Sequence, residues 1–197
     1  ITRKGSERII RYAFELAKKQ NRKKVTVVHK ANILRKTCGL FREVAFEVAK
    51  DYKKNYNIEI EEVLVDAMAM RLIKQPQDFE VIVTTNLFGD ILSDEACMLV
   101  GGLGLAASAN IGNKNAVFEP VHGSAPKYAG KNVVNPIAAI LSSKMMLEYL
   151  NENNATNKIE EAVIRLLKNK KILTKDLGGT SKTTEVTKEI INIINRK

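Results

Sequence analysis

The first half of the chain shows two kinds of hydrophobic spacing, one typical of amphipathic helices and one typical of buried strands. Apolar residues at helical spacing predict helices at 7–20, 37–51 and 68–73, the first with an N-cap at Ser6. Short apolar and β-branched runs predict strands at 25–29, 58–65 and 81–85. Because strands separated by helices form parallel sheets with right-handed crossovers, this half of the chain predicts an α/β fold.

The second half of the chain has a different texture, with many glycine and other small residues before its helices begin. A short strand is predicted at 116–119, and helices are predicted at 136–150, 159–167 and 185–194. Residues 120–130 are too rich in glycine and proline for an element interior, so they predict a turn or a ligand cradle. Residues 151–158 are predicted to be a linker, and neither a Walker loop nor a GxGxxG fingerprint is present.

Two aspartates follow the third predicted strand. Residues 86–89 interrupt the pattern, and a helix is predicted from Asp90, which places Asp90 and Asp94 four residues apart on one face. Like charges in this arrangement repel each other unless a cation or a basic partner lies between them. A second interpretation is that the dipole at the start of the helix favours both carboxylates.

Polar residues also follow the other predicted strands. Lys30 comes after the first strand, Asp66 after the second, and Asn86 with Asp90 after the third. In a parallel sheet the carboxyl ends of the strands meet at one edge, where ligands bind. We therefore expect the lysine and the three aspartates to come together there. Taken singly, each has an ordinary interpretation, such as a solvated lysine or a helix-capping aspartate.

The composition narrows the classes of function. The formal net charge of +10 is typical of a lysine-rich surface, and it also suits polyanionic ligands such as tricarboxylates and phosphorylated cofactors. With no tryptophan, 6% aromatic residues and no known nucleic-acid-binding motif, no nucleic-acid partner is expected. No apolar run is long enough for a membrane span. Two cysteines without CxxC spacing fit a reducing compartment, so a cytoplasmic location is expected, with a mitochondrial one as the alternative.

Seven sequence blocks follow one another along the chain between His29 and Glu185: HKANILRKTCGLF from His29, DAMAM from Asp66, NLFGDILSD from Asn86, GGLGLAASANIG from Gly101, FEPVHGSAPKYAGK from Phe118, NPIAAILSSKMML from Asn135 and DLGGTSKTTE from Asp176. In these blocks the chain resembles the metal-dependent β-decarboxylating dehydrogenases, which include isocitrate, homoisocitrate and 3-isopropylmalate dehydrogenases. The resemblance implies the fold of that family, with parallel-containing sheets flanked by helices and the N-terminal portion absent. It implies that residues 1–100 are the latter part of a small, dimer-forming domain and residues 101–197 the C-terminal half of a large cofactor-binding domain.

The resemblance also implies roles for individual residues. Lys30 matches the catalytic lysine that manages the proton on the substrate hydroxyl, and Asn32 matches an asparagine near the substrate and the nicotinamide. The carboxylates that match those around Mg²⁺ or Mn²⁺, hard ions that prefer oxygen ligands, are Asp66, Asp90 and Asp94. In the family, the residues matching Lys30 and Asp66 serve the active site of the partner subunit, which implies a homodimer or an assembly of dimers. The implied cofactor-binding residues are His122, Gly123, Ser124, Ala125, Lys127, Tyr128 and Asn135.

Lys127 and Tyr128 bear on the choice between NADP and NAD. Members of the family that use NAD typically carry an aspartate after the loop that resembles HGSAP. A cation and a phenol at this position instead suit the 2′-phosphate of NADP, which an aspartate would repel. NADP is therefore expected. The segment that begins at Asp176 resembles the NAD-type ending, so NAD stays the alternative.

The reaction implied by the resemblance is the oxidative decarboxylation of isocitrate to 2-oxoglutarate, with reduction of NADP or NAD and a need for Mg²⁺ or Mn²⁺. Homoisocitrate and 3-isopropylmalate are alternative hydroxy-acid substrates, because the family's substrate-gripping residues precede the matched region. A further alternative is a non-catalytic regulatory subunit of a heteromeric isocitrate dehydrogenase. The matched lysine and aspartates are intact, which favours a catalytic subunit. The 197 residues by themselves are expected to be inactive.

Overall fold

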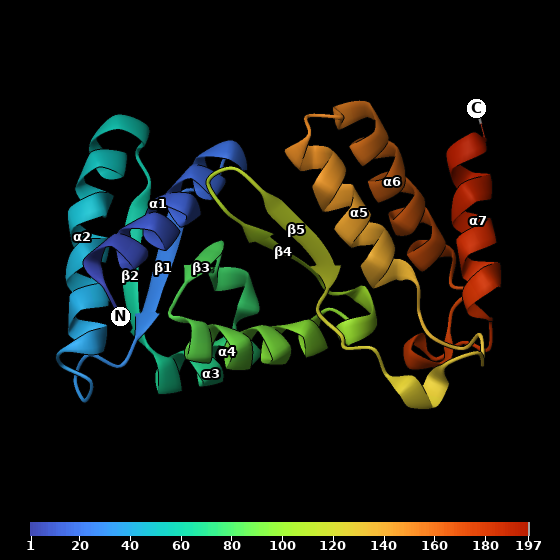
Figure 1. The fold of residues 1–197 in the computed structure, drawn as a ribbon, viewed down its shortest axis with the longest axis horizontal. Coiled ribbons are helices and arrows are strands. Elements are labelled where there is room, and N and C mark those ends of the chain that lie inside the picture. Colours follow the sequence, from blue (N-terminus) through green and yellow to red (C-terminus); the bar gives the residue numbers. More distant parts are fainter. Residues whose placement is uncertain (197) are drawn as a thin grey trace. The chain divides into compact units, whose positions relative to one another are not determined.

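The structure, a computed structural model, describes residues 1–196. Within them the chain forms two compact units, which divide between Ala96 and Cys97 (Figure 1). This division lies close to the predicted one after residue 100, and the role of either part in a whole molecule stays a prediction. None of the described helices is both long and apolar enough to cross a bilayer.

A parallel sheet with the strand order β2–β1–β3 forms the centre of the N-terminal unit. Its strands are β1 (Lys24–His29), β2 (Glu59–Leu64) and β3 (Val81–Val83). The helices of this unit are α1 (Arg3–Lys19), α2 (Thr37–Tyr56), α3 (Val65–Lys74) and α4 (Asn86–Leu99). Val25 pairs with Ile60 on one side and with Val81 on the other, so β1 is the central strand. The predicted parallel α/β sheet is confirmed.

Helices cover both faces of this sheet, which explains why β1 is apolar along most of its length. Val25 and Val27 belong to a core shared with α1 and α2, in which Phe14 and Phe41 are almost completely buried. Val28 belongs to a second core, shared with α3 and α4. Successive side chains of a strand point to opposite faces, so one short strand supports both layers.

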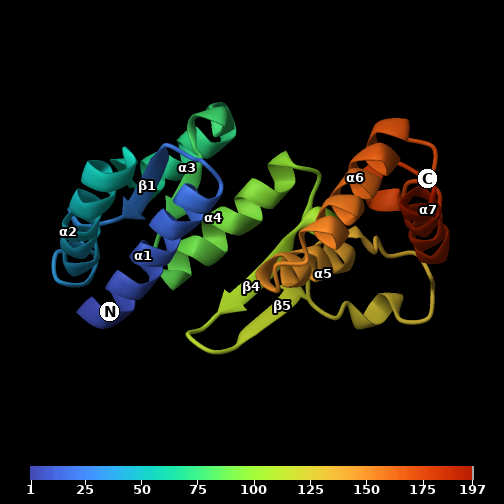
Figure 2. The same ribbon diagram turned by 90° about the horizontal axis from the view of Figure 1, so that it is seen from above.

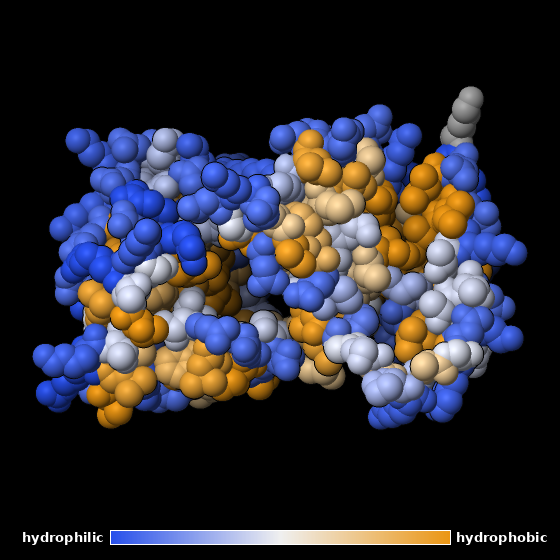
Figure 3. Space-filling model, viewed as in Figure 1, coloured by the Kyte–Doolittle hydropathy of each residue, from blue (hydrophilic) through white to orange (hydrophobic). Residues whose placement is uncertain are grey.

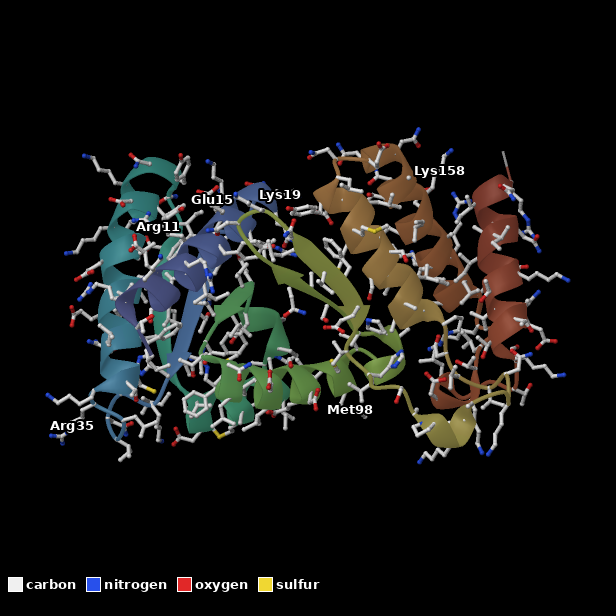
Figure 4. All side chains as sticks on the ribbon, in the orientation of Figure 1. Arg11, Glu15, Lys19, Arg35, Met98 and Lys158 are labelled. Atoms are coloured by element: carbon white, nitrogen blue, oxygen red, sulfur yellow. The ribbon has the colours of Figure 1, made fainter. Side chains whose placement is uncertain are left out.

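A buried tyrosine joins α1 to α2. The hydroxyl of Tyr52 donates a hydrogen bond to Glu15 Oε1 at 2.8 Å, and its ring stacks on Phe14 with 4.9 Å between the ring centroids. Figure 4 labels Glu15 on α1, on the side that meets α2. Burial, followed by the hydrogen bond to Glu15, raises the pKa of Tyr52 to about 12. The phenol therefore stays protonated at neutral pH and continues to hold the two helices together.

An antiparallel hairpin packs against helices in the C-terminal unit, and Figure 2 shows it beside α5. The elements are β4 (Ala107–Ile111), β5 (Ala116–Pro120), α5 (Ile137–Tyr149), α6 (Asn153–Asn169) and α7 (Thr183–Asn195). Ile137, Leu166 and Ile190 bring the three helices together in one core. Strand β4 was not predicted, because its small residues give no hydrophobic alternation. Its pairing with β5, which sets Ala109 opposite Phe118, makes it a strand.

Two predicted helix starts are wrong. Thr2 caps α1, since its Oγ1 accepts a hydrogen bond from Gly5 N at 3.1 Å, whereas Ser6 is buried inside the helix. Helix α4 already begins at Asn86, and Gly89 N donates a helical hydrogen bond to the carbonyl of residue 85 at 2.8 Å. A glycine within the first turns of a helix costs only about 1 kcal/mol, which packing of the helix offsets.

The predicted linker at 151–158 is also wrong. Asn151 takes a left-handed conformation, with a φ of 62°, and completes a short turn after α5. The chain then enters α6 at Asn153, and Thr156 is already buried. The asparagine- and lysine-rich composition indicated a solvated linker, but burial of one face stabilises a helix that local propensity does not favour.

Candidate active site

The carboxyl edge of the parallel sheet brings Lys30 and Asp66 together, as the sequence predicts. Lys30 follows β1, and Asp66 lies in the first turn of α3, directly after β2. His29 and Leu64 are register partners at the ends of these neighbouring strands, so the residues that follow start from adjacent positions. Lys30 Nζ lies 2.5 Å from Asp66 Oδ1, in an ion pair whose lysine is mostly shielded and whose carboxylate is largely exposed.

The ion pair fixes the charge of Asp66. The hydrogen bond from Lys30 holds the pKa of this carboxyl below its usual value, and backbone hydrogen bonds at the start of α3 act in the same direction. Asp66 is therefore ionised at neutral pH while most of its carboxylate faces solvent. An ionised carboxylate is the form that pairs with a protonated lysine or binds a metal ion.

Asn32 lies in a tight turn that begins at Lys30. The backbone N–H groups of Ile33 and Leu34 both donate to the carbonyl of Lys30, at 3.1 and 2.8 Å. The turn leaves the side chain of Asn32 exposed, close in sequence to the lysine. The structure therefore places Asn32 beside the candidate site without giving its side chain a partner among the described residues.

Asp90 and Asp94 lie four residues apart on α4, and both are exposed. Neither lies in the first turn of the helix, where a dipole effect would be largest, so the dipole does not account for the pair. Within residues 1–196, neither aspartate forms an ion pair with a basic side chain. Both carboxylates are exposed, where water and salt screen their repulsion, so a metal ion between them stays a prediction.

The predicted meeting of three aspartates does not occur within one chain. Among the described residues, no three His, Cys, Asp or Glu side chains are placed to hold a metal ion together. Asp66 is engaged with Lys30, and Asp90 and Asp94 form a separate pair on α4. The donors are the hard carboxylate oxygens that Mg²⁺ and Mn²⁺ prefer, so the residues fit such an ion in kind, while a complete ligand set needs a further group.

The glycine-rich loop of the C-terminal unit borders a cavity of about 250 Å³. The predicted residues Ser124, Ala125 and Tyr128 line it, and so do Asn132 and Thr183, which sequence reasoning missed. Ala125 has a φ of 44°, a left-handed conformation that is strained for a residue with a Cβ. Such strain often occurs at ligand sites, where the surrounding structure stabilises it.

Asn132 fastens this loop to the start of α7. Its carbonyl accepts from Thr183 N at 3.0 Å, and its side-chain Oδ1 accepts from Thr184 N at 3.1 Å. The amide nitrogen of the same side chain donates to Thr184 Oγ1 at 3.0 Å. Asn132 itself adopts a left-handed conformation with a φ of 55°. Asparagine tolerates the left-handed conformation better than most residues, so an asparagine in this glycine-rich loop is the sequence feature that could have pointed to Asn132.

Other predicted cofactor residues lie along the same loop. The exposed Lys127 places its Nζ 5.1 Å from the ring centroid of Tyr128, although Lys127 does not line the cavity. The Nδ1 of His122 is hydrogen-bonded to the carbonyl of Gly123 at 3.0 Å, and Gly123 is exposed. The loop thus carries a half-buried histidine, an exposed glycine, a cation and a phenol within residues 122–128.

Asn135 has a different setting, because it is buried and its side chain already has partners. Its Oδ1 accepts from Ile137 N at 3.0 Å, and its Nδ2 donates to Asp176 Oδ2 at 2.9 Å. A Cβ at Gly104 would lie 2.6 Å from the same Asp176 oxygen, so the three residues are closely packed. Asn135 therefore shapes the start of α5 from within, and its predicted contact with a cofactor stays a prediction.

A larger open groove, of about 890 Å³, follows α2 in the N-terminal unit. Basic residues such as Arg35 and Lys50 line it together with Glu43 and Glu47, both of which pair with Arg3. No predicted site residue lines this groove. Its size does not make it the candidate active site, because its charges are of mixed sign and lie along an exposed helix.

These features define an α/β protein with an acid–base pair at the carboxyl edge of a parallel sheet and a glycine-rich loop around a small cavity. The chain belongs to the isocitrate/isopropylmalate dehydrogenase family, whose sequence model matches residues 1–193. The predicted family and fold are therefore confirmed.

Individual relatives agree with this assignment. The chain is 61% identical to homoisocitrate dehydrogenase of Methanocaldococcus jannaschii over all of its own length and 55% of that protein. It is 54% identical to 3-isopropylmalate dehydrogenase of Archaeoglobus fulgidus, covering 99% of this chain and 59% of the relative. The crystal structure of isocitrate dehydrogenase from Methylococcus capsulatus superposes with a TM-score of 0.95 at 51% identity, covering 100% of this chain and 57% of that one. The chain thus spans a little over half the length of these relatives.

Proposed function

We propose that the full-length protein catalyses the NAD(P)-dependent oxidative decarboxylation of a 2-hydroxy acid that carries a carboxylate on the neighbouring carbon. The observation that carries this proposal is the 2.5 Å ion pair of Lys30 and Asp66, at the sheet edge where ligands bind. Membership of the family supports the same reaction. Because the chain spans about half of its relatives, we expect residues 1–197 alone to give no turnover.

The residues of this chain would divide the work as follows. Lys30 would take up the proton that the substrate hydroxyl releases on oxidation, and Asp66 would orient the lysine amine; a bound nicotinamide would supply the hydride acceptor. The β-keto acid then loses CO₂, and a general acid returns a proton to the resulting enolate. When bound, Mg²⁺ or Mn²⁺ supplies Lewis-acid polarisation of the substrate oxygen. Asp90 and Asp94 of one copy, with Asp66 of a second copy, are the residues that would hold that ion.

Isocitrate is our first candidate substrate, because GLF after the lysine block and SANIG after the glycines resemble isocitrate and homoisocitrate enzymes. Homoisocitrate is the second candidate, supported by the 61% identity to an enzyme of that name. The third, 3-isopropylmalate, has support from the relative of 54% identity. The three acids share the reacting atoms and differ in the group on the carbon that loses CO₂.

For the cofactor we propose NADP, with NAD as the alternative. Lys127 and Tyr128 are consecutive on the loop, with the ammonium 5.1 Å from the centroid of the phenol ring, and a cation and a phenol suit a 2′-phosphate. The adjoining cavity of about 250 Å³ is smaller than the roughly 300–1,000 Å³ of most ligand pockets. It fits one part of a dinucleotide rather than the whole molecule.

We also propose that two copies of the protein share each site as a homodimer. Two of the candidate metal carboxylates, Asp66 and Asp94, stand at helical spacing with exposed apolar residues. On α3 the series is Asp66, Met70 and Ile73, and on α4 it is Leu87, Ile91 and Asp94. Figure 3 shows hydrophobic residues gathered where Figure 1 places these helices. A second copy that covers these faces would shield the apolar residues from water. Its Asp66 would add the third carboxylate to the Asp90–Asp94 pair, because no three such side chains meet within the described residues of one chain.

The test is an assay of the full-length protein for reduction of the nicotinamide with each of the three acids, with NADP and NAD, and with Mn²⁺ or a chelator. Turnover that the chelator abolishes supports the proposal, and the preferred acid and cofactor follow from the ratios of kcat/KM. No turnover with any of the acids would overturn it and favour the non-catalytic regulatory subunit.

Variants connect the assay to the site. Lys30→Met and Asp66→Asn are expected to lower kcat by at least 100-fold, the usual size of a positioned acid–base contribution. Lys50→Met, at an exposed lysine of α2, is the matched control and should keep the activity of the parent. Equal activity of Lys30→Met and Lys50→Met would exclude the proposed role of Lys30.

A further inference from the structure

His29, the last residue of β1, makes a hydrogen bond that the proposed chemistry does not use. Its ring is almost completely buried, with 3% of its surface exposed. The backbone N–H of Ala31 points to its Nδ1 at 3.2 Å. Ala31 lies between Lys30 and Asn32, so this bond joins the sheet to the backbone between two candidate site residues.

The bond selects one form of the ring. Nδ1 accepts the Ala31 N–H, so it carries no hydrogen, and the neutral ring must carry its hydrogen on Nε2. Nε2 lies 3.3 Å from Glu62 Oε2, where that hydrogen can be donated. The two ring nitrogens thus have opposite roles, and reversing the ring would break both contacts.

Arg42 holds Glu62 in place. Its Nη2 donates to Glu62 Oε1 at 3.0 Å, and its Nε donates to Oε2, the oxygen that also faces His29. The Arg42 guanidinium lies over the ring of Phe46, at 5.0 Å from the ring centroid. A two-point contact between a guanidinium and a carboxylate restricts both side chains strongly. The chain of contacts therefore runs from α2 through β2 to the loop after β1.

We propose that His29, fixed by Glu62 and Arg42, is a positioning residue that sets the backbone of the loop from Lys30 to Asn32. The proposal rests on the proposed function, because it gives a purpose to the placement of Lys30 against Asp66. The remaining loop residues, 32–36, are all exposed, and the other bonds near its start are local ones to the Lys30 carbonyl. Without the His29 contact, little else would hold Ala31.

Two substitutions separate the nitrogens of the ring. His29→Asn keeps an acceptor close to the position of Nδ1 and loses the contact with Glu62. His29→Gln keeps a donor near the position of Nε2 and loses the acceptor for Ala31. The matched control is Glu61→Gln on β2, next to Glu62, because the Glu61 carboxylate contacts Arg71 and Lys24 rather than His29.

The first measurement is hydrogen exchange of residues 30–36 in the full-length protein, together with the rate of tryptic cleavage after Arg35, which Figure 4 shows at the end of this loop. His29→Gln is expected to speed both by about tenfold, which corresponds to losing one hydrogen bond of roughly 1.4 kcal/mol. His29→Asn should stay closer to the parent, and Glu61→Gln should match it. Equal rates in all four proteins would overturn the proposal.

The second measurement is steady-state kinetics. His29→Gln is expected to lower kcat while leaving the KM for the nicotinamide cofactor unchanged, and His29→Asn should restore much of kcat. A faster loop with unchanged kcat in an active enzyme would overturn the positioning role. If the parent protein itself shows no turnover but the exchange pattern is as expected, the proposed function fails, while the role of His29 in holding the loop stands.

Discussion

Lys30 and Asp66 are 36 residues apart in the sequence and meet because β1 and β2 run parallel in a fixed register. Each residue is ordinary when taken singly, and neither its type nor its neighbours require a partner. The contact keeps the Asp66 carboxylate ionised and orients the Lys30 amine toward it. At this scale the sequence predicted that Lys30 and Asp66 meet at the carboxyl edge of the sheet, but not the contact of Glu62 with Arg42 and His29 behind them.

Loss of the lysine should appear in the titration of Asp66. Lys30→Met is expected to raise the pKa of Asp66 toward the ordinary aspartate value of about 3.9, because the largest cause of its lowering is gone. With a lowered folded-state pKa, the contribution of the pair to stability is present above the ordinary pKa. It is lost as the pH falls through the folded value.

Carboxyl-carbon NMR of the protein measures this midpoint directly. Lys50→Met serves as the control and should leave the Asp66 midpoint where it is. A midpoint that is the same with and without Lys30 would show that the ion pair does not form in solution.

At the scale of elements, the sequence predicted the four α-helices and three strands of the N-terminal unit because their hydrophobic spacing is regular, but not the short 3-10 turn Pro76–Asp78. It missed β4, whose small residues become a strand only through pairing with β5. The sequence also predicted a linker at 151–158, where α6 begins. Its polar composition does not show that neighbouring helices bury one face of this segment.

The segment between α6 and α7 depends on a glycine that the sequence did not single out. Gly179 N donates to Thr174 O at 3.0 Å, and a Cβ at Gly179 would lie 2.0 Å from the carbonyl oxygen of Leu173. Gly179→Ala is therefore expected to lower the free energy of unfolding of the C-terminal unit by about 1–3 kcal/mol, as overpacking usually does.

Urea denaturation followed by circular dichroism would measure the change. Gly123→Ala is the matched control, because a Cβ there meets nothing within 4 Å and its φ is not positive. Two variants of equal stability would contradict the predicted clash at Leu173.

At the scale of the whole molecule, the apolar faces of α3 and α4 predict self-association. Ile91, with 57% of its surface exposed, lies one turn from Asp94. Ile91→Lys is expected to raise the dimer dissociation constant by at least tenfold, since a buried ammonium in an apolar contact costs more than about 1.4 kcal/mol.

Sedimentation velocity of the full-length protein over a range of concentrations measures the association. Ile164→Lys, at an exposed position of α6, is the control and should associate like the parent. If Ile91→Lys also associates like the parent, the contact surface lies elsewhere on the protein.

The sequence by itself determined the α/β class, the family and the candidate residues, because helical and strand spacings are local and the motif blocks are contiguous. The tertiary structure decided which of those residues meet: Lys30 with Asp66, but not the three aspartates within one chain. It also decided that the side-chain amide of Asn135 donates a hydrogen bond to Asp176 and that Nε2 of His29 faces Glu62. Such contacts depend on strand register and helix packing across long stretches of chain, which no local pattern specifies.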